Sequence, residues 1–203
     1  MTGNGKRLSR AELLTERDQR NYREWEAKEQ ARFLAERDVA KASGAAWADF
    51  LPGFESIEPG APRPHVFANA HKVVLVYSPT SRGPARLVMF DFVRFVSLGY
   101  PSEDALEGHP LYGSGLRRFH VHEVFNSELI AGLEERNRVH PHHRPEVFTE
   151  SRHVLFAFHD RTFDCVCRSW RTYMTEAPFK DVLLMATDAL ISGELSGPGV
   201  GDE

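Results

Sequence analysis

The stretch HVLFAFHDRTFDCVCRSW, residues 153–170, decides the fold. Two runs rich in aromatic and β-branched residues, VLFAF and TFDCV, flank the polar residues 159–161, and this pattern is typical of a β-hairpin. Because side chains alternate across a strand, a two-residue loop brings several apolar side chains onto one face, which we expect to be core. The expected pairs on that face are Phe158 with Phe163, Phe156 with Cys165, and Val154 with Cys167.

The opposite face of the hairpin mixes apolar and ionisable residues. In the same register His153, Leu155, Ala157 and His159 lie against Arg168, Val166, Asp164 and Thr162. His159 and Asp164 are then diagonal neighbours within side-chain reach. A carboxylate orients an imidazole and raises its basicity, as a general base requires, so we predict that His159 and Asp164 form a functional acid–base pair. The alternative is a solvated or structural pair, because half-exposed antiparallel sheets carry polar residues on the solvated side.

The size and charge of the chain limit the classes of function. Its 203 residues and 23.0 kDa suit one domain with an appendage. The net charge of -4 and the pI near 6.2 argue against a general nucleic-acid binder. The N-terminus is charged from Lys6 onward, and no apolar run approaches the ~18 residues needed to cross a bilayer. Cys165 and Cys167 suit small buried hydrophobes better than a disulfide, so we expect a cytoplasmic location.

The N-terminal third predicts a helical arm and a linker. Residues 1–8 are expected to be disordered. A helix is expected to begin after Ser9 and to continue to about Lys41, with Ser9 and Glu12 forming a capping box at its start. Its thin apolar stripe predicts docking along the body or a partner subunit, and a solvated arm is the alternative. The stripe contains Leu14, Tyr22, Trp25 and Phe33. We therefore assign residues 1–51 to a charged helical arm and the Pro/Gly-rich residues 52–64 to a connector.

The pattern of residues 65–192 predicts an α+β domain, and we expect residues 193–203 to form a disordered tail. Strands are expected at 72–77, 86–98 and 118–125, besides the hairpin. Asn126 or Ser127 caps a helix that continues to Arg138, and a second helix covers 179–191. We expect a mostly antiparallel sheet of about five strands, with helices packed on one side and the long N-terminal helix added.

A glycine-rich loop and several histidines are further candidates. The loop YPSEDALEGHPLYGSGL, residues 100–116, begins with a short helix at 102–106, and its glycines allow close approach of a ligand or serve as turns. His120 and His122 share one side of a strand, as metal ligands do, but Glu123 faces the other side. A third ligand would come from His109, His153 or His159, and the histidines of residues 140–143 suit an exposed loop. Metal binding is therefore a weak alternative.

Three segments, HPLYGSGL (109–116), HEVFNS (122–127) and FAFHDRTFDC (156–165), form short motifs. They resemble motifs close to HPLxGxGL, EVxNS and FTFHDxTFEC of an uncharacterised bacterial protein family, over roughly residues 75–170. The resemblance implies no activity, and His120 and His122 fall outside its pattern. The residues that it includes are His109, Gly113, Gly115, Glu123, Asn126, His159, Asp160 and Thr162.

The sequence favours a small-molecule enzyme that uses histidine and carboxylate acid–base chemistry on an open sheet face, with no organic cofactor. The predicted catalytic residues are His159, Asp164 and Glu123. The predicted ligand-binding residues are His109, Gly113, Gly115, Asn126 and Asp160. The alternative is a non-catalytic module that binds a protein partner, or a second copy, through the same face and the N-terminal helix. A metal-dependent enzyme that uses the histidines is the third hypothesis.

Overall fold

The computed structural model describes the backbone of residues 16–61 and 63–194, and the side chains from residue 20 onward. The predictions for residues 1–8, Ser9, Glu12 and Leu14, and for residues 195–203 of the tail, lie outside the described residues. The strands are β1 Trp47–Phe50, β2 His65–Ala68, β3 Lys72–Tyr77, β4 Ala85–Asp91, β5 Phe95–Gly99, β6 Val121–Phe125, β7 Arg152–Ala157, β8 Thr162–Cys167 and β9 Ser169–Thr175. The helices are α1 Glu16–Ser43, α2 Glu128–Asn137, α3 Glu146–Thr149 and α4 Phe179–Ser192, with a short 3₁₀ helix, η1, at Glu103–Gly108.

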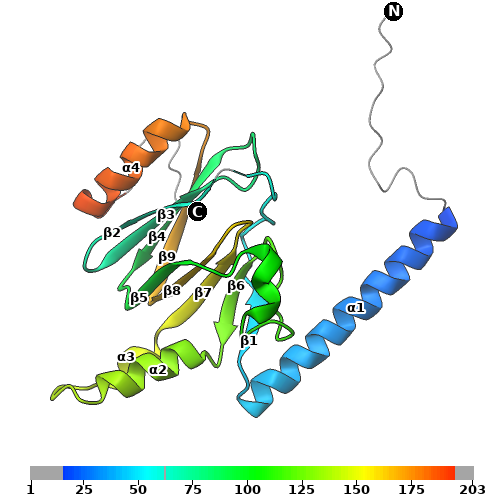
Figure 1. Cartoon of the computed structure of the whole chain (residues 1–203), viewed down its shortest axis with the longest axis horizontal. Helices are drawn as coiled ribbons and strands as arrows, with labels where there is room; N and C mark the ends of the chain where they lie inside the picture. The colour runs from blue at the N-terminus through cyan, green and yellow to red at the C-terminus, as the bar shows by residue number, and fades with distance from the viewer. Residues whose placement is uncertain (1–15, 62, 195–203) are drawn as a thin grey trace, which may run out of the picture.

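The predicted α+β class is confirmed, and the strands lie in two antiparallel sheets (Figure 1). The five-stranded sheet has the order β1-β6-β7-β8-β5, and the four-stranded sheet has the order β2-β3-β4-β9. One buried cluster joins Leu75 and Phe90 of the four-stranded sheet to Phe156 and Phe163 of the five-stranded sheet. Apolar faces of two sheets exclude water by packing together, so this cluster is the main core.

The single strand predicted over residues 86–98 is wrong. The chain leaves β4 at Asp91, turns at Phe92 with φ of 53°, and enters β5 at Phe95 in the other sheet. The apolar residues on both sides of the segment led to the error. In β4 they face the second sheet on one side and α4 on the other, so a two-sided apolar pattern arises without one long central strand.

The hairpin forms, but its register differs from the prediction by two residues. Phe156 pairs with Phe163 and Val154 pairs with Cys165, because the turn is centred on residues 159 and 160, one residue earlier than expected. A shift of two residues preserves the alternation of side chains, so all six predicted apolar side chains still lie in the core cluster. The shift gives Asp164 a different diagonal neighbour, which is His153 instead of His159.

The outer faces of the two sheets are covered differently. Helix α4 packs Val182, Ala186 and Ala189 against β3 and β4 on the far side of the four-stranded sheet (Figure 1). On the five-stranded sheet, Leu106 of η1 and Leu111 of the following loop pack near Leu155. This loop covers only part of that outer face, which leaves room for a pocket beside it.

Gly115 seats the end of the glycine-rich loop against β1. Its φ is 88°, and a Cβ atom at this position would lie 2.2 Å from the carbonyl oxygen of Ala48 and 2.8 Å from the indole of Trp47. The loop and the strand are also joined by the N–H of Ala48, which donates to the carbonyl of Ser114 over 2.8 Å. Only a residue without a side chain permits this close approach.

Among the side chains described for the N-terminal helix, the buried ones lie in its C-terminal half. Phe33 and Ala40 are buried with Trp47, while Tyr22 and Trp25 of the predicted stripe are 51% and 57% exposed. Figure 1 shows α1 extending away from the sheets. Residues 47–50, which the sequence assigned to the arm, form β1 and pair with β6. Among the described residues, no helix combines the length and apolarity needed to span a membrane.

Candidate functional site

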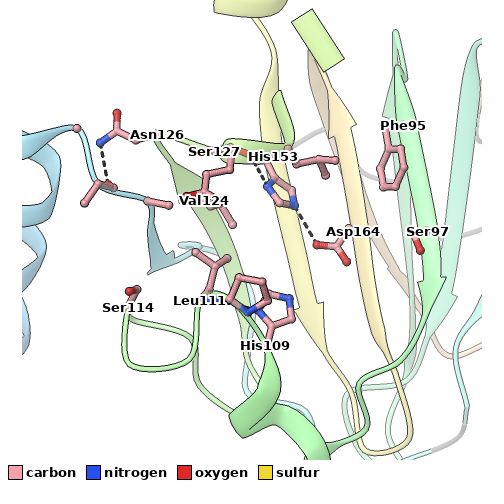
Figure 2. Close-up of a pocket in the computed structure, with 16 residues that line it drawn as sticks. Phe95, Ser97, His109, Leu111, Ser114, Val124, Asn126, Ser127, His153 and Asp164 are labelled. Atoms are coloured by element: carbon pink, nitrogen blue, oxygen red, sulfur yellow. Dashed lines mark hydrogen bonds and ion pairs between the residues drawn. The ribbon is translucent and has the colours of Figure 1, made fainter. Parts of the chain in front are cut away.

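A pocket of about 580 Å³ opens on the outer face of the five-stranded sheet. Its floor includes His153 of β7 and Asp164 of β8, and its walls come from β5, the loop at 109–114, the first turn of α2 and residues 44–46 (Figure 2). The 16 lining residues include two histidines, two carboxylates and no lysine or arginine. Ionisable groups at the base of a concave, partly apolar pocket are typical of ligand-binding and active sites.

His153 is held between Ser127 and Asp164 (Figure 2). Its Nε2 lies 2.9 Å from Oδ1 of Asp164, and its Nδ1 lies 2.8 Å from Oγ of Ser127. An ionised carboxylate only accepts hydrogen bonds, so Asp164 assigns the proton of neutral His153 to Nε2. Nδ1 then carries the lone pair and accepts from the Ser127 hydroxyl. With 5% of its surface exposed, His153 is a buried imidazole with both nitrogens bonded.

The position of Ser127 follows from the strand-to-helix turn at residues 126–127. Asn126, with φ of 49°, ends β6, and its side-chain amide donates to the carbonyl of Ala45 over 3.0 Å. Ser127 is the N-cap of α2, and its Oγ accepts from the N–H of Ile130 over 3.3 Å. The predicted cap is confirmed. The same oxygen thus receives a backbone hydrogen bond and faces His153.

His109 approaches the pair from the loop opposite the two strands (Figure 2). Its Nδ1 accepts from the N–H of Leu111 over 3.1 Å, so a neutral ring carries its proton on Nε2. Burial lowers the pKa of His109, and this effect outweighs the opposing influence of the Asp164 charge. His109 is therefore a neutral donor near physiological pH, and it is the one histidine predicted for ligand binding that lines this pocket.

The predicted contact between His159 and Asp164 is wrong. His159 is half exposed at the hairpin turn, and its Nδ1 lies 2.5 Å from Oε2 of Glu103. That hydrogen bond raises the pKa of His159. The turn residue Asp160 contacts Arg63 at 3.3 Å instead of the pocket. A register shift of two residues accounts for the change of partner.

Glu123 also lies away from the pocket. It faces the opposite side of β6 from His122, as expected, and accepts two hydrogen bonds from Arg152 at 2.6 and 2.7 Å. The Arg152 guanidinium lies 4.0 Å from the ring centre of Trp170. Of the residues predicted for the site, the structure thus places Asp164, His109 and Asn126 around one pocket, whereas Gly113 and Gly115 shape the loop beside it.

The remaining histidines form no converging set. Nε2 of His122 accepts from the N–H of Arg117 over 3.1 Å, and Nδ1 of His120 lies 2.7 Å from the carbonyl of Arg118. In the loop after α2, His143 contacts Glu134 at 3.0 Å. Within residues 20–61 and 63–194, no three His, Cys, Asp or Glu side chains are grouped so that they could hold a metal ion. This geometry does not favour the metal hypothesis.

We expect acidification to destabilise the fold through His122. Burial lowers the pKa of this imidazole from 6.5 to about 3. Between these values the unfolded chain binds a proton that the folded chain does not, so the free energy of unfolding falls as the pH falls below about 6.5. From about pH 7 to pH 5 the expected loss from this residue is roughly 2 kcal/mol.

Urea unfolding of the wild type and of His122→Gln at both pH values measures this loss. Glutamine keeps an acceptor for the N–H of Arg117 but does not titrate in this range. The wild type should lose roughly 2 kcal/mol more than the variant between the two pH values. Equal losses would contradict the assignment of the proton uptake to His122.

Sequence reasoning missed the two residues that complete the arrangement around Asp164. It placed His153 on the correct face but opposite Arg168, and it treated Ser127 only as a helix cap. A hairpin centred on His159 and Asp160 would have made His153 the diagonal neighbour of Asp164. No local pattern links Ser127 to His153, because the two are 26 residues apart and meet only when β6 pairs with β7.

Comparison with known proteins found no matching family model, no similar curated protein and no similar solved structure. The case for a function therefore rests on the pocket itself.

Proposed function

We propose that the protein is a small-molecule enzyme that uses acid–base chemistry in the pocket on the five-stranded sheet. The observation that carries the proposal is the hydrogen bond between His153 and Asp164, at 2.9 Å, on the floor of that pocket. A carboxylate that fixes the tautomer of an imidazole is a recurring arrangement around general bases. Asp164 keeps its predicted role as the orienting group, and His153 takes the role that the sequence gave to His159.

Each ionisable group has a defined task in this proposal. Asp164 holds the ring of His153, whose Nδ1 accepts a proton through the hydroxyl of Ser127. His109, neutral and protonated on Nε2, donates a hydrogen bond to a substrate oxygen. The proposal needs no organic cofactor. Two buried, unpaired cysteines support a reducing, cytoplasmic setting.

The test incubates the protein with a small-molecule cell extract and measures the compounds in the extract by mass spectrometry. Wild-type protein should deplete at least one compound and accumulate a product, while the His153→Ala variant should do neither. Circular dichroism verifies that both proteins are folded. If the folded wild type and the variant leave the same extract profile, the acid–base proposal fails.

A second candidate function is protein binding through α1. Tyr22 and Trp25 are both more than half exposed, and their ring centres lie 5.9 Å apart on a helix that projects from the body. Exposed aromatic pairs are enriched at interfaces between proteins. The occupant that this reading favours is a second copy of the chain, which carries the same aromatic pair.

Sedimentation velocity over a concentration series tests this second function. Replacing both Tyr22 and Trp25 with alanine should abolish concentration-dependent association. The control is Val39→Ala, at a position on the same helix that is 69% exposed and should leave the association unchanged. A wild type that stays monomeric throughout the series would exclude self-association by α1.

A further inference from the structure

We propose that Ser127 is a nucleophile and that the pocket hydrolyses neutral carboxylic esters by acyl transfer to its Oγ. This inference rests on the proposed acid–base role of His153 and names both the reaction and the substrate class. A serine hydroxyl is a weak nucleophile until a neighbouring base accepts its proton, and His153 is placed to do so.

The first support is an unbroken chain of hydrogen bonds. Oγ of Ser127 lies 2.8 Å from Nδ1 of His153, and Nε2 of the same ring lies 2.9 Å from Oδ1 of Asp164. Serine hydrolases on unrelated folds contain the same three groups in contact, and they are recognised by geometry and not by sequence order. The ring is reversed here, with Nδ1 on the serine, but either nitrogen of an imidazole can act as the base.

The second support is the place of Ser127 in the fold. It follows a strand and opens α2, with Asn126 in the left-handed region before it. Glu128 and Leu129, the next two residues, also line the pocket. The N–H groups of a first helical turn have no acceptor within the helix, so these two can donate to an oxyanion that forms beside Ser127.

The lining of the pocket selects the substrate class. It offers no lysine or arginine to bind a phosphate or a carboxylate, and Glu128 and Asp164 repel anions. Much of the wall is apolar. These apolar residues are Ala45, Ala46, Phe95, Leu111, Val124 and Leu129. A neutral ester with an apolar acyl group fits this environment, whereas the carboxylate product is repelled.

The reaction takes two balanced steps. Oγ of Ser127 attacks the ester carbonyl while its proton passes to Nδ1 of His153. The alcohol leaves with that proton as the tetrahedral intermediate collapses, and the acyl group remains on Ser127. Water then attacks the acyl-enzyme, gives one proton to Nδ1 and releases the carboxylic acid, and the proton returns to Oγ of Ser127.

An alkyl fluorophosphonate tests the nucleophile directly, because an activated serine displaces fluoride and keeps the phosphonyl group. Intact-protein mass spectrometry should show a single addition to the wild type, and peptide mapping should place it on Ser127. Ser127→Ala and Ser127→Gly should be labelled at least about 100-fold more slowly. Glycine is included because it keeps the start of α2 more stable than alanine does.

The matched control is Ser169→Ala, which removes an exposed serine from β9 and should leave the labelling rate unchanged. His153→Ala should slow the labelling about 100-fold without moving its site. Labelling of another residue, or no labelling of folded wild type, overturns the nucleophilic role. Depletion of the cell extract that needs His153 but persists in Ser127→Ala would overturn only this inference and leave the acid–base proposal standing.

Discussion

His153→Ala should lower kcat/KM for the compound depleted from the extract by about 10²–10⁴-fold, because it removes the proposed base. The residue is 5% exposed and both of its ring nitrogens are bonded, so alanine removes a buried imidazole together with both of its hydrogen bonds. Initial rates at substrate concentrations well below KM measure the loss.

The matched control for this variant is His159→Ala. Both histidines bond a carboxylate, but His159 is half exposed and pairs with Glu103 at the hairpin turn. Its removal should change kcat/KM by less than about threefold, as for a surface substitution away from the site. Asp164→Asn serves as a second variant, because it keeps the shape of the side chain and removes the charge that orients His153. A variant of His159 as damaged as that of His153 would contradict the assignment.

Gly115→Ala should be the most destabilising of the loop substitutions, with an expected loss of about 3–5 kcal/mol. The new Cβ would lie 2.2 Å from the carbonyl of Ala48, and the backbone φ of 88° is unfavourable for alanine. Strand β1 or the loop must move to relieve the clash. Because the same loop carries His109 and Leu111, the pocket should lose its wall as well.

Gly113→Ala is the matched control, since Gly113 has a similar φ of 82° but open space around its Cβ position. It should cost only the backbone strain, about 1 kcal/mol. Urea unfolding of both variants separates strain from the clash. Equal losses would show that the approach of Gly115 to Ala48 is not what limits substitution.

Local pattern was enough to predict most elements but not how they pair. The runs at 72–77 and 179–191 lie within one residue of β3 and α4, and Ser127 caps α2 as expected. These features depend on side-chain periodicity and on single capping hydroxyls, which are local. The division into two sheets depends on the turn at Phe92, where no glycine or proline in the sequence indicates the end of a strand.

The candidate site shows the same limit. Asp164 was chosen for the right face, and its partner was missed because the position of a two-residue turn differs by one residue. Because the turn sets the register of the paired strands, this small difference gives Asp164 a different histidine as its diagonal neighbour. Ser127 joins the pair from another strand connection, so only tertiary structure brings it there.

The chain passes between the two sheets three times, from β1 to β2, from β4 to β5 and from β8 to β9. Neither sheet is therefore encoded by one continuous segment, and β4 completes its ladder only with β9, so that Ala85 pairs with Thr175. Such non-local pairing gives a high contact order, which slows folding. During synthesis the four-stranded sheet stays incomplete until β9, Ser169–Thr175, has emerged, so the pocket on the other sheet gains its full support only after that strand is made.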